Sequence, residues 1–323
     1  MQKKKRDRGI FPFPREIPYY CFKEFIALDA DRFTMLKTLF DNLHLCYTVC
    51  HVNGNRHFFV YPKGLIPVKG KFSVKDRSSE LVFQKALAKA SIATVLAAHY
   101  DRAAGSPGAN DNSAGVFELI KTALALKMDN IGNWLIIFTD KEELKFGDSL
   151  VEQGSYTLAK ALKDSGLEKA QVFIFDCCGI GDTLVISTAV DHMLKKDECL
   201  RFSRSRHLIA QMRERALTTA RNIRMEKVVL VPTPFSDDAG FFRAGIAAQT
   251  ITVLPSHEAA ELVSVLRVKP EFAAALVSKQ EATASGFLPP TWAILNTAED
   301  TMDKLTPRFF QNIVTFAYTL ITG

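Results

Sequence analysis

Histidine and acidic side chains directly follow three short apolar runs in the middle of the chain. These side chains are His99, Asp101, Glu142, Glu143 and Asp176. Imidazole and carboxylate groups without thiolates are typical zinc ligands in hydrolytic sites. Carboxylates held close together in a dry site oppose one another, and a divalent cation relieves that repulsion. The residue types therefore predict a metal site for hydrolytic chemistry.

The adjacent pair Glu142 and Glu143 suits a division of roles. Two metal ions about 3.5–4 Å apart, bridged by one carboxylate, activate a water molecule and polarise a carbonyl group together. Neighbouring side chains on a loop point in different directions, so one glutamate would bind metal while the other stays free as general base. Each acidic residue taken alone is also compatible with a solvated pair or a turn cap. Their occurrence in order after successive apolar runs favours the metal site.

The arrangement of the apolar runs explains how distant residues would meet. From residue 93 onward, short apolar runs alternate with helical patterns, which is typical of a mostly parallel sheet covered by helices on both faces. The predicted strands are residues 93–98, 134–138, 172–175, 184–187, 228–231 and 250–254. The predicted helices are residues 113–127, 156–163, 205–221 and 307–321. Functional groups in such sheets gather beyond the carboxyl ends of the strands, where the histidine and the acidic side chains fall.

The first 80 residues follow a different pattern. They predict a helix at residues 31–43 and strands near residues 57–61 and 71–74, separated by Gly and Pro. No linker rich in Pro, Gly or Ser and no internal repeat divides the 323 residues. We therefore expect a single α/β domain with three α/β/α layers around a central, mostly parallel mixed sheet. Residues 1–80 would supply the N-terminal helix and strands, and residues 90–323 the metal-site region.

Bulk properties exclude several classes of protein. Apolar residues make up 47% of the chain and charged residues 24%, as in ordinary globular proteins. The uncharged apolar stretches are far shorter than the roughly 20 residues of a membrane-spanning helix. The N-terminus runs from basic residues into prolines without the apolar core of a signal peptide. Six cysteines without a C-x-x-C pair are most simply free thiols, so we expect a cytoplasmic protein with no membrane partner.

The net charge of +6 raises the question of an acidic partner such as nucleic acid. Basic residues cluster at positions 3–8 and 201–224. In the second cluster they alternate with apolar residues such as Ile209 and Met212 at helical spacing. This pattern is typical of an amphipathic helix with a solvated basic face, so we expect no nucleic-acid partner.

Six segments resemble successive motifs of the co-catalytic zinc aminopeptidases of the bacterial leucyl aminopeptidase and aminopeptidase Y type, whose relatives include glutamate carboxypeptidase and glutaminyl cyclase. These segments are His99-x-Asp101, residues 106–115, Glu142-Glu143, Asp176, residues 236–241 and residues 296–301. The resemblance extends over roughly residues 90–320. It implies a phosphorylase/hydrolase-like zinc exopeptidase fold, one or two zinc ions and a peptide or small amide substrate.

The resemblance also implies a ligand set. His99 and Asp176 would bind one zinc ion, Glu143 would bind the other, and Asp111 would bridge the two. The last ligand of the family is a histidine, and this chain has Asn296 at that degenerate position. An amide oxygen is a weak, neutral zinc ligand. We therefore expect the ion shared by Asp111 and Glu143 to bind poorly or to be absent.

His257 is the alternative replacement for the missing histidine. It follows the predicted strand at residues 250–254, in a loop expected at the same edge of the sheet. A surface histidine at the start of a helix is the commoner explanation for such a residue. Residues 256–290 look like an insertion before the last motif, which would wall the pocket or form an interface.

The same resemblance gives two residues catalytic roles. Asp101 would hold the second ring nitrogen of His99 and thereby fix its tautomer. Glu142 would be the general base that takes a proton from a zinc-activated water and returns it to the leaving amine. Asp237 lies in a segment that supports the site in relatives. We therefore expect an aminopeptidase that hydrolyses N-terminal peptide bonds.

Two other functions stay open. A non-catalytic relative that keeps the fold for binding would lose a ligand first, as at Asn296. Glutaminyl cyclase is the weaker alternative, because related cyclases hold a single zinc at the positions of Asp111, Glu143 and the missing histidine. The sequence also leaves the oligomeric state open, with a homo-oligomer as one alternative.

Overall fold

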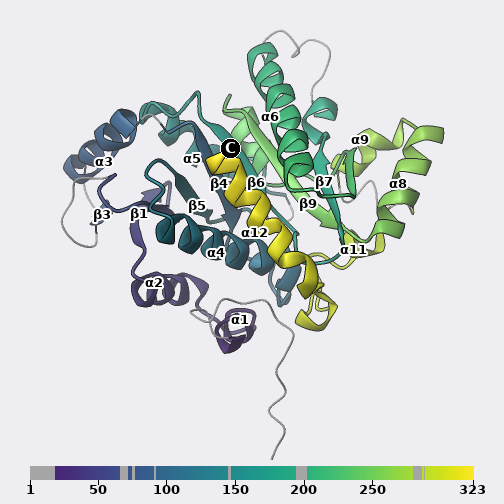
Figure 1. Ribbon diagram of the computed structural model, residues 1–323, viewed down its shortest axis with the longest axis horizontal. Helices are drawn as coiled ribbons and strands as arrows, with labels where there is room; N and C mark the ends of the chain where they lie inside the picture. Colours follow the sequence, from purple (N-terminus) through teal and green to yellow (C-terminus); the bar gives the residue numbers. More distant parts are fainter. Residues whose placement is uncertain are drawn as a thin grey trace, which may run out of the picture.

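A nine-stranded sheet runs through the part of the chain that the structure, a computed structural model, describes: residues 19–65, 72–74, 77–90, 92–144, 147–193, 202–278, 286 and 288–323. Its strands are β1 Cys46–Val52, β2 Asn55–Tyr61, β3 Phe72–Val74, β4 Thr94–His99, β5 Leu135–Thr139, β6 Gln171–Phe175, β7 Thr183–Ser187, β8 Val228–Val231 and β9 Ala248–Leu254. They lie in the order β3-β1-β2-β5-β4-β6-β9-β7-β8 (Figure 1). Five of the eight adjoining pairs are parallel, and β1–β2, β2–β5 and β7–β9 are antiparallel. The prediction of a mostly parallel mixed sheet is therefore confirmed.

Helices cover both faces of the sheet. They are α1 Tyr19–Phe25, α2 Arg32–Asn42, α3 Arg77–Ala90, α4 Gly115–Met128, α5 Gly154–Asp164, α6 Ser203–Asn222, α7 Asp237–Arg243, α8 Ser256–Val268, α9 Phe272–Val277, α11 Pro290–Ala293 and α12 Pro307–Thr322. On one face α12 packs against both α4 and α6 (Figure 1). On the other face α5 packs against α7. The three-layer α/β/α architecture is confirmed. Each predicted strand and helix occurs within about two residues of its expected bounds.

Strand β4 shows why the central runs are mostly apolar. Successive side chains of a strand point to opposite faces of the sheet. Leu96 and Ala98 therefore join a core that includes Ile120 of α4. Val95 and Ala97 join the opposite core, which includes Leu158 of α5. A strand buried on both faces has no solvated side, so a continuous apolar run identifies it.

Several elements were not predicted. Strand β1 has the sequence CYTVCHV, in which polar and apolar residues are mixed, and α1, α3 and α7 were missed as well. The segment at residues 256–290 contains α8 and α9 and the first residue of α11. The short α9 and α11 have six and four residues, too few to show a helical period.

The structure also bears on three expectations from composition. None of the helices within the described ranges combines the length and hydropathy needed to cross a membrane. Five cysteines are free thiols, and Cys199 lies outside the described residues. The basic cluster at residues 3–8 also lies outside them. The second basic cluster falls largely on α6, whose buried face includes Ile209 and Met212, so the amphipathic helix is confirmed.

Candidate active site

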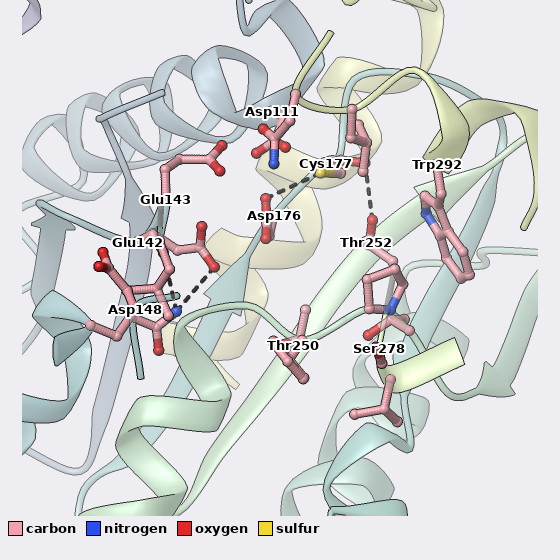
Figure 2. A pocket seen from close by; sticks show the side chains of 18 of the residues that line it. Asp111, Glu142, Glu143, Asp148, Asp176, Cys177, Thr250, Thr252, Ser278 and Trp292 are labelled. Atoms are coloured by element: carbon pink, nitrogen blue, oxygen red, sulfur yellow. Dashed lines mark hydrogen bonds between the residues drawn. The ribbon is translucent and has the colours of Figure 1, made fainter. Parts of the chain in front are cut away.

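The carboxyl ends of three adjacent parallel strands bring the predicted residues together. Strand β4 lies between β5 and β6. His99 ends β4, Glu142 and Glu143 follow β5, and Asp176 follows β6. These acidic residues and Asp111 line one cavity of about 920 Å³ (Figure 2).

His99 is the centre of the cluster and is fully buried. Its Nε2 atom lies 3.1 Å from Asp111 Oδ1 and 3.4 Å from Asp176 Oδ1. Neither ring nitrogen of His99 has a hydrogen-bond partner, although both are buried. Burial opposes an imidazolium, but the charge of Asp176 and the other nearby carboxylates raises the pKa of His99 well above its ordinary value.

Two groups of side chains offer ligand atoms close enough to share a metal ion. One group is His99, Asp111 and Asp176, and the other is His99, Glu142 and Glu143. Within each group the ligand atoms lie within 4.8 Å of one another. Burial raises the pKa of Glu143 to about 9, and the charge of Asp111 adds to this shift. Without a cation, the site therefore favours protonated over ionised glutamates.

Asp101 links His99 to the glutamate pair. Its Oδ1 atom lies 3.4 Å from His99 Nδ1. The backbone N–H groups of Glu142 and Glu143 donate hydrogen bonds to its two carboxylate oxygens, at 3.1 Å each. Burial works against the charge of Asp101, yet the His99 contact and these donors lower its pKa. Asp101 therefore faces the imidazole ring and also fixes the loop that carries both glutamates.

The loop that carries Asp111 is held by hydrogen bonds from three directions. The backbone N–H groups of Asn110 and Asp111 donate to the Asp300 carboxylate at 2.8 and 2.9 Å. Asn110 Oδ1 accepts from the backbone of Gly179, and Asn112 Nδ2 donates to the carbonyl of Phe175. The Asp111–Asn112 peptide bond is cis. The amide side chains on either side of Asp111 are therefore structural anchors.

Gly108 begins this loop in the left-handed region, with φ of 59°. A Cβ atom at this position would lie 2.6 Å from the carbonyl oxygen of Asp111. Glycine is therefore required here both for its backbone conformation and for the close approach of the chain.

Glu142 is oriented by Gln153. The side-chain amide of Gln153 donates to Glu142 Oε1 at 3.1 Å. Ser155 Oγ donates to Gln153 Oε1 at 2.9 Å, which fixes the orientation of that amide. Burial raises the pKa of Glu142 well above its ordinary value. In contrast, Glu143 Oε1 is buried without any hydrogen-bond partner.

Asp237 lies behind the cluster and does not line the cavity. It is fully buried, and Thr139 Oγ1 donates to its Oδ2 atom at 2.5 Å. Burial raises its pKa to about 7. This position agrees with a supporting role for the segment at residues 236–241.

Sequence comparison adds a decisive observation to this geometry. Residues 84–321, well over half of the chain, match Peptidase family M28. The chain belongs to this family. None of the curated proteins compared with this M28 chain matches its sequence.

Solved structures share the fold of the M28 chain. A leucine aminopeptidase precursor from Bacteroides thetaiotaomicron VPI-5482 and a glutaminyl cyclase from Porphyromonas gingivalis are each 14% identical to it, with TM-scores of 0.58. Each match covers 97% of this chain and 98% of the other. BSAP, a zinc aminopeptidase from Bacillus subtilis, is 19% identical with a TM-score of 0.49 over 82% of this chain. The M28 chain spans only 49% of the BSAP chain.

The two candidates for the last M28 ligand differ in position. Asn296 lines the cavity together with Asp111 and Glu143. It is exposed and has a left-handed backbone, with φ of 64°. His257 stands at the start of α8 with its side chain 80% exposed, and it does not line the cavity. The structure therefore brings Asn296, and not His257, to the cavity.

The remaining walls of the M28 cavity are largely apolar. Phe235, Leu295 and Trp292 line it, and Val277 and Ser278 come from the segment at residues 256–290. That segment therefore supplies part of the wall. Among the described residues that line the cavity there is no Lys, Arg or His, whereas five are acidic. The cavity thus combines apolar surface with a cluster of acidic groups.

Three residues with structural roles at the M28 site were missed in the sequence. Asp300 belongs to the last motif, residues 296–301, and its place in that motif could have indicated a role at the site. Gln153 gave no signal, because a lone glutamine before a helix is usually exposed. Arg32 is 5% exposed and donates to the loop that carries Asp111. Nothing in the sequence near Arg32 connects it with a loop more than 70 residues away.

Proposed function

We propose that this M28 peptidase is a zinc aminopeptidase. The observation that carries the proposal is the convergence of His99, Asp111 and Asp176 beside Glu142 and Glu143 in one cavity. Carboxylates and an imidazole with unpartnered, buried nitrogens form a donor set that suits zinc. Bound zinc would polarise the substrate carbonyl and lower the pKa of water.

Each residue has a task that its contacts support. His99, Asp111 and Asp176 would hold one ion, and Asp111 and Glu143 would hold a second, weaker one. Asp101 sets the tautomer of His99, because its carboxylate faces Nδ1 and leaves Nε2 directed at Asp111 and Asp176.

Glu142 is the proposed general base. Its carboxylate would accept a proton from the attacking water and donate it to the leaving amine. The hydrogen bond from Gln153 fixes the Oε1 atom, so the carboxylate is positioned before substrate arrives.

The charge of the cavity supports action at the amino end of a peptide. A carboxypeptidase needs a cationic group for the terminal carboxylate. The described lining of this cavity contains five acidic residues and no basic one. Such a lining offers hydrogen-bond acceptors to a terminal ammonium group and no cationic partner to a terminal carboxylate. The apolar wall around Trp292 would accept an apolar first side chain.

The test compares Glu142→Gln with Glu143→Gln. Each variant is reconstituted with zinc, its zinc content is measured, and hydrolysis of free and N-acetylated leucyl anilides is followed. We expect Glu142→Gln to keep the zinc content and lose activity by about a hundredfold or more. Glu143→Gln should instead weaken the second, weaker zinc position, which is measured as the zinc taken up beyond one ion per chain while zinc is in excess. Full activity of Glu142→Gln would refute its role, and equal hydrolysis of the acetylated substrate would refute aminopeptidase specificity.

The same zinc-reconstituted protein also tests the two alternative functions, glutaminyl cyclase and a non-catalytic relative. A glutaminyl cyclase would release ammonia from a peptide with N-terminal glutamine without removing a residue. A non-catalytic relative would bind no zinc and hydrolyse neither substrate. The cytoplasmic location and the single domain stay predictions, and the oligomeric state stays open.

A further inference from the structure

Arg32 is a buried cation that donates hydrogen bonds to the loop that carries Asp111, which is called the metal-site loop below. It opens α2 and is only 5% exposed. The three nitrogens of its guanidinium group donate hydrogen bonds to five carbonyl oxygens and one hydroxyl. These acceptors are the carbonyls of Phe25, Tyr100, Asp101, Pro107 and Gly108 and the Oγ atom of Ser113.

The acceptors belong to the two segments that carry metal-site residues. Nη1 donates to Tyr100 and Asp101 at 3.1 and 3.0 Å, directly after His99. Nη2 donates to Pro107, Gly108 and Ser113 at 2.8, 3.3 and 2.9 Å. One planar group therefore joins the end of β4 to the loop that carries Asp111.

The chemistry of these contacts is unusual for a buried arginine. Buried guanidinium groups are generally paired with carboxylates, whereas each acceptor of Arg32 in the described residues is a neutral oxygen. Burial lowers the pKa of Arg32 to about 9, while the charges of Asp101, Asp111 and Asp300 oppose that shift. Its charge is therefore balanced by the acidic cluster as a whole.

The close fit of Gly108 supports a positioning role. A Cβ atom on Gly108 would lie 2.9 Å from Nη2 of Arg32. The loop thus approaches the guanidinium so closely that no other residue fits at this position without a shift.

We propose that Arg32 is a positioning residue that sets the metal affinity of the cluster without touching metal or substrate. It does so by fixing the distance between the segments that carry His99 and Asp111. A lysine keeps the charge but has one nitrogen, which cannot reach both segments in a fixed plane. The inference rests on the proposed function only in that the cluster binds a divalent cation.

Arg32→Lys is the test, and Arg102→Lys is its matched control. Arg102 is partly exposed and its guanidinium donates to the carbonyls of Ile26 and Leu28, so it ties the segment after His99 to the N-terminal segment without donating to Pro107, Gly108 or Ser113. The zinc dissociation constant of each full-length variant is measured by competition with a chromogenic chelator. Thermal unfolding of the zinc-free proteins gives the loss of fold stability separately.

We expect Arg32→Lys to weaken zinc binding by about tenfold or more, because charged hydrogen bonds at the loop are lost. Arg102→Lys should stay within about twofold of the wild type, the equivalent of less than one ordinary hydrogen bond. Zinc binding of Arg32→Lys at the wild-type level would overturn the inference. An equal loss in both variants would overturn it as well, because the role would then be general stability.

A milder variant covers the case in which Arg32→Lys does not fold. Ser113→Ala removes one acceptor of Nη2, together with the hydrogen bond that the same hydroxyl donates to the Gly108 carbonyl, and leaves the arginine in place. We expect zinc affinity to fall by about threefold, and an unchanged affinity would count against the inference. If the wild type binds zinc and only the Arg32 predictions fail, the proposed function stands. If the wild type binds no zinc, both fail.

Discussion

Asp300 Oδ2 lies 2.9 Å from the backbone nitrogen of Asp111 and accepts its hydrogen bond. The other oxygen of Asp300 accepts from Asn110 at 2.8 Å. Asp300 is fully buried, so both of its oxygens serve the loop rather than solvent. The last motif of the chain therefore shapes the metal-site loop even though its first residue is Asn296 and not histidine.

Replacing Asp300 by asparagine should disturb this loop. An amide has one acceptor oxygen, so one of the two N–H groups loses its partner, at a cost of about 1–3 kcal/mol. We expect the midpoint of urea unfolding to fall and zinc affinity to fall with it. Glu299→Gln is the control, because Glu299 is 71% exposed and its ion-pair partner is Lys304. Equal behaviour of the two variants would contradict the prediction.

Replacing Asn296 by histidine should restore the second metal position. The backbone at this residue has φ of 64°, and histidine is among the residues that tolerate the left-handed region. We expect the bound zinc to rise from about one to about two ions per chain, measured by atomic absorption after removal of excess metal. Thr297→His places an imidazole one residue away and should leave the stoichiometry unchanged. A value of one ion for both variants would show that the loop does not bring position 296 to the metal.

Replacing Gln153 by methionine should separate catalysis from metal binding. The variant keeps the volume of the side chain but removes the donor to Glu142 Oε1. We expect kcat to fall by about tenfold with unchanged zinc content, because the general base loses its orientation. Gln211→Met on α6 is the control, since Gln211 is exposed and its hydrogen-bond partner is His207. A change in zinc content alone would assign Gln153 to metal binding instead.

The buried carboxyl group of Glu118 should make the free energy of unfolding depend on pH. It lies on α4, is fully buried, and neither carboxylate oxygen has a hydrogen-bond partner. Burial raises its pKa well above the ordinary value of 4.5. The folded state therefore binds this proton more tightly than the unfolded state, and stability is lost as pH rises above 4.5. The slope from this one group is at most about 1.4 kcal/mol per pH unit.

The variant Glu118→Gln is neutral at every pH, so its stability should fall less steeply between about pH 5 and 8. Urea unfolding at several pH values measures this slope. Glu261→Gln, at an exposed position of α8, should keep the wild-type slope. A Glu118→Gln slope identical to that of the wild type would mean that Glu118 is solvated in the folded protein.

The central sheet could be predicted because its signals are local. Residues 95–98, for example, form a continuous apolar run because β4 is buried on both faces. Strand β1 could not be recognised in the same way, because Thr48 and His51 interrupt its apolar pattern. Helix α3 did contain a helical period in Phe83, Ala86 and Leu87, all of which are buried.

The sequence predicted which acidic residues meet at the candidate site but not which residues support them. The order of His99, Glu142 and Asp176 along the chain indicated which strand ends would meet. Contacts made by Arg32 were beyond prediction, because a charged residue at the start of a helix is usually exposed. Only the packing of α2 against the sheet brings Arg32 to its carbonyl acceptors.

The contacts of the metal-site loop also impose an order of events during synthesis. Arg32 leaves the ribosome long before this loop, whereas Asp300 is made 189 residues after Asp111. A growing chain therefore carries His99, Asp111 and Asp176 outside the ribosome while the N–H groups of the loop still lack their acceptor. The final geometry of the metal-site loop therefore has to wait until Asp300 has been made and has packed against it, long after the ligand residues themselves have been joined to the chain.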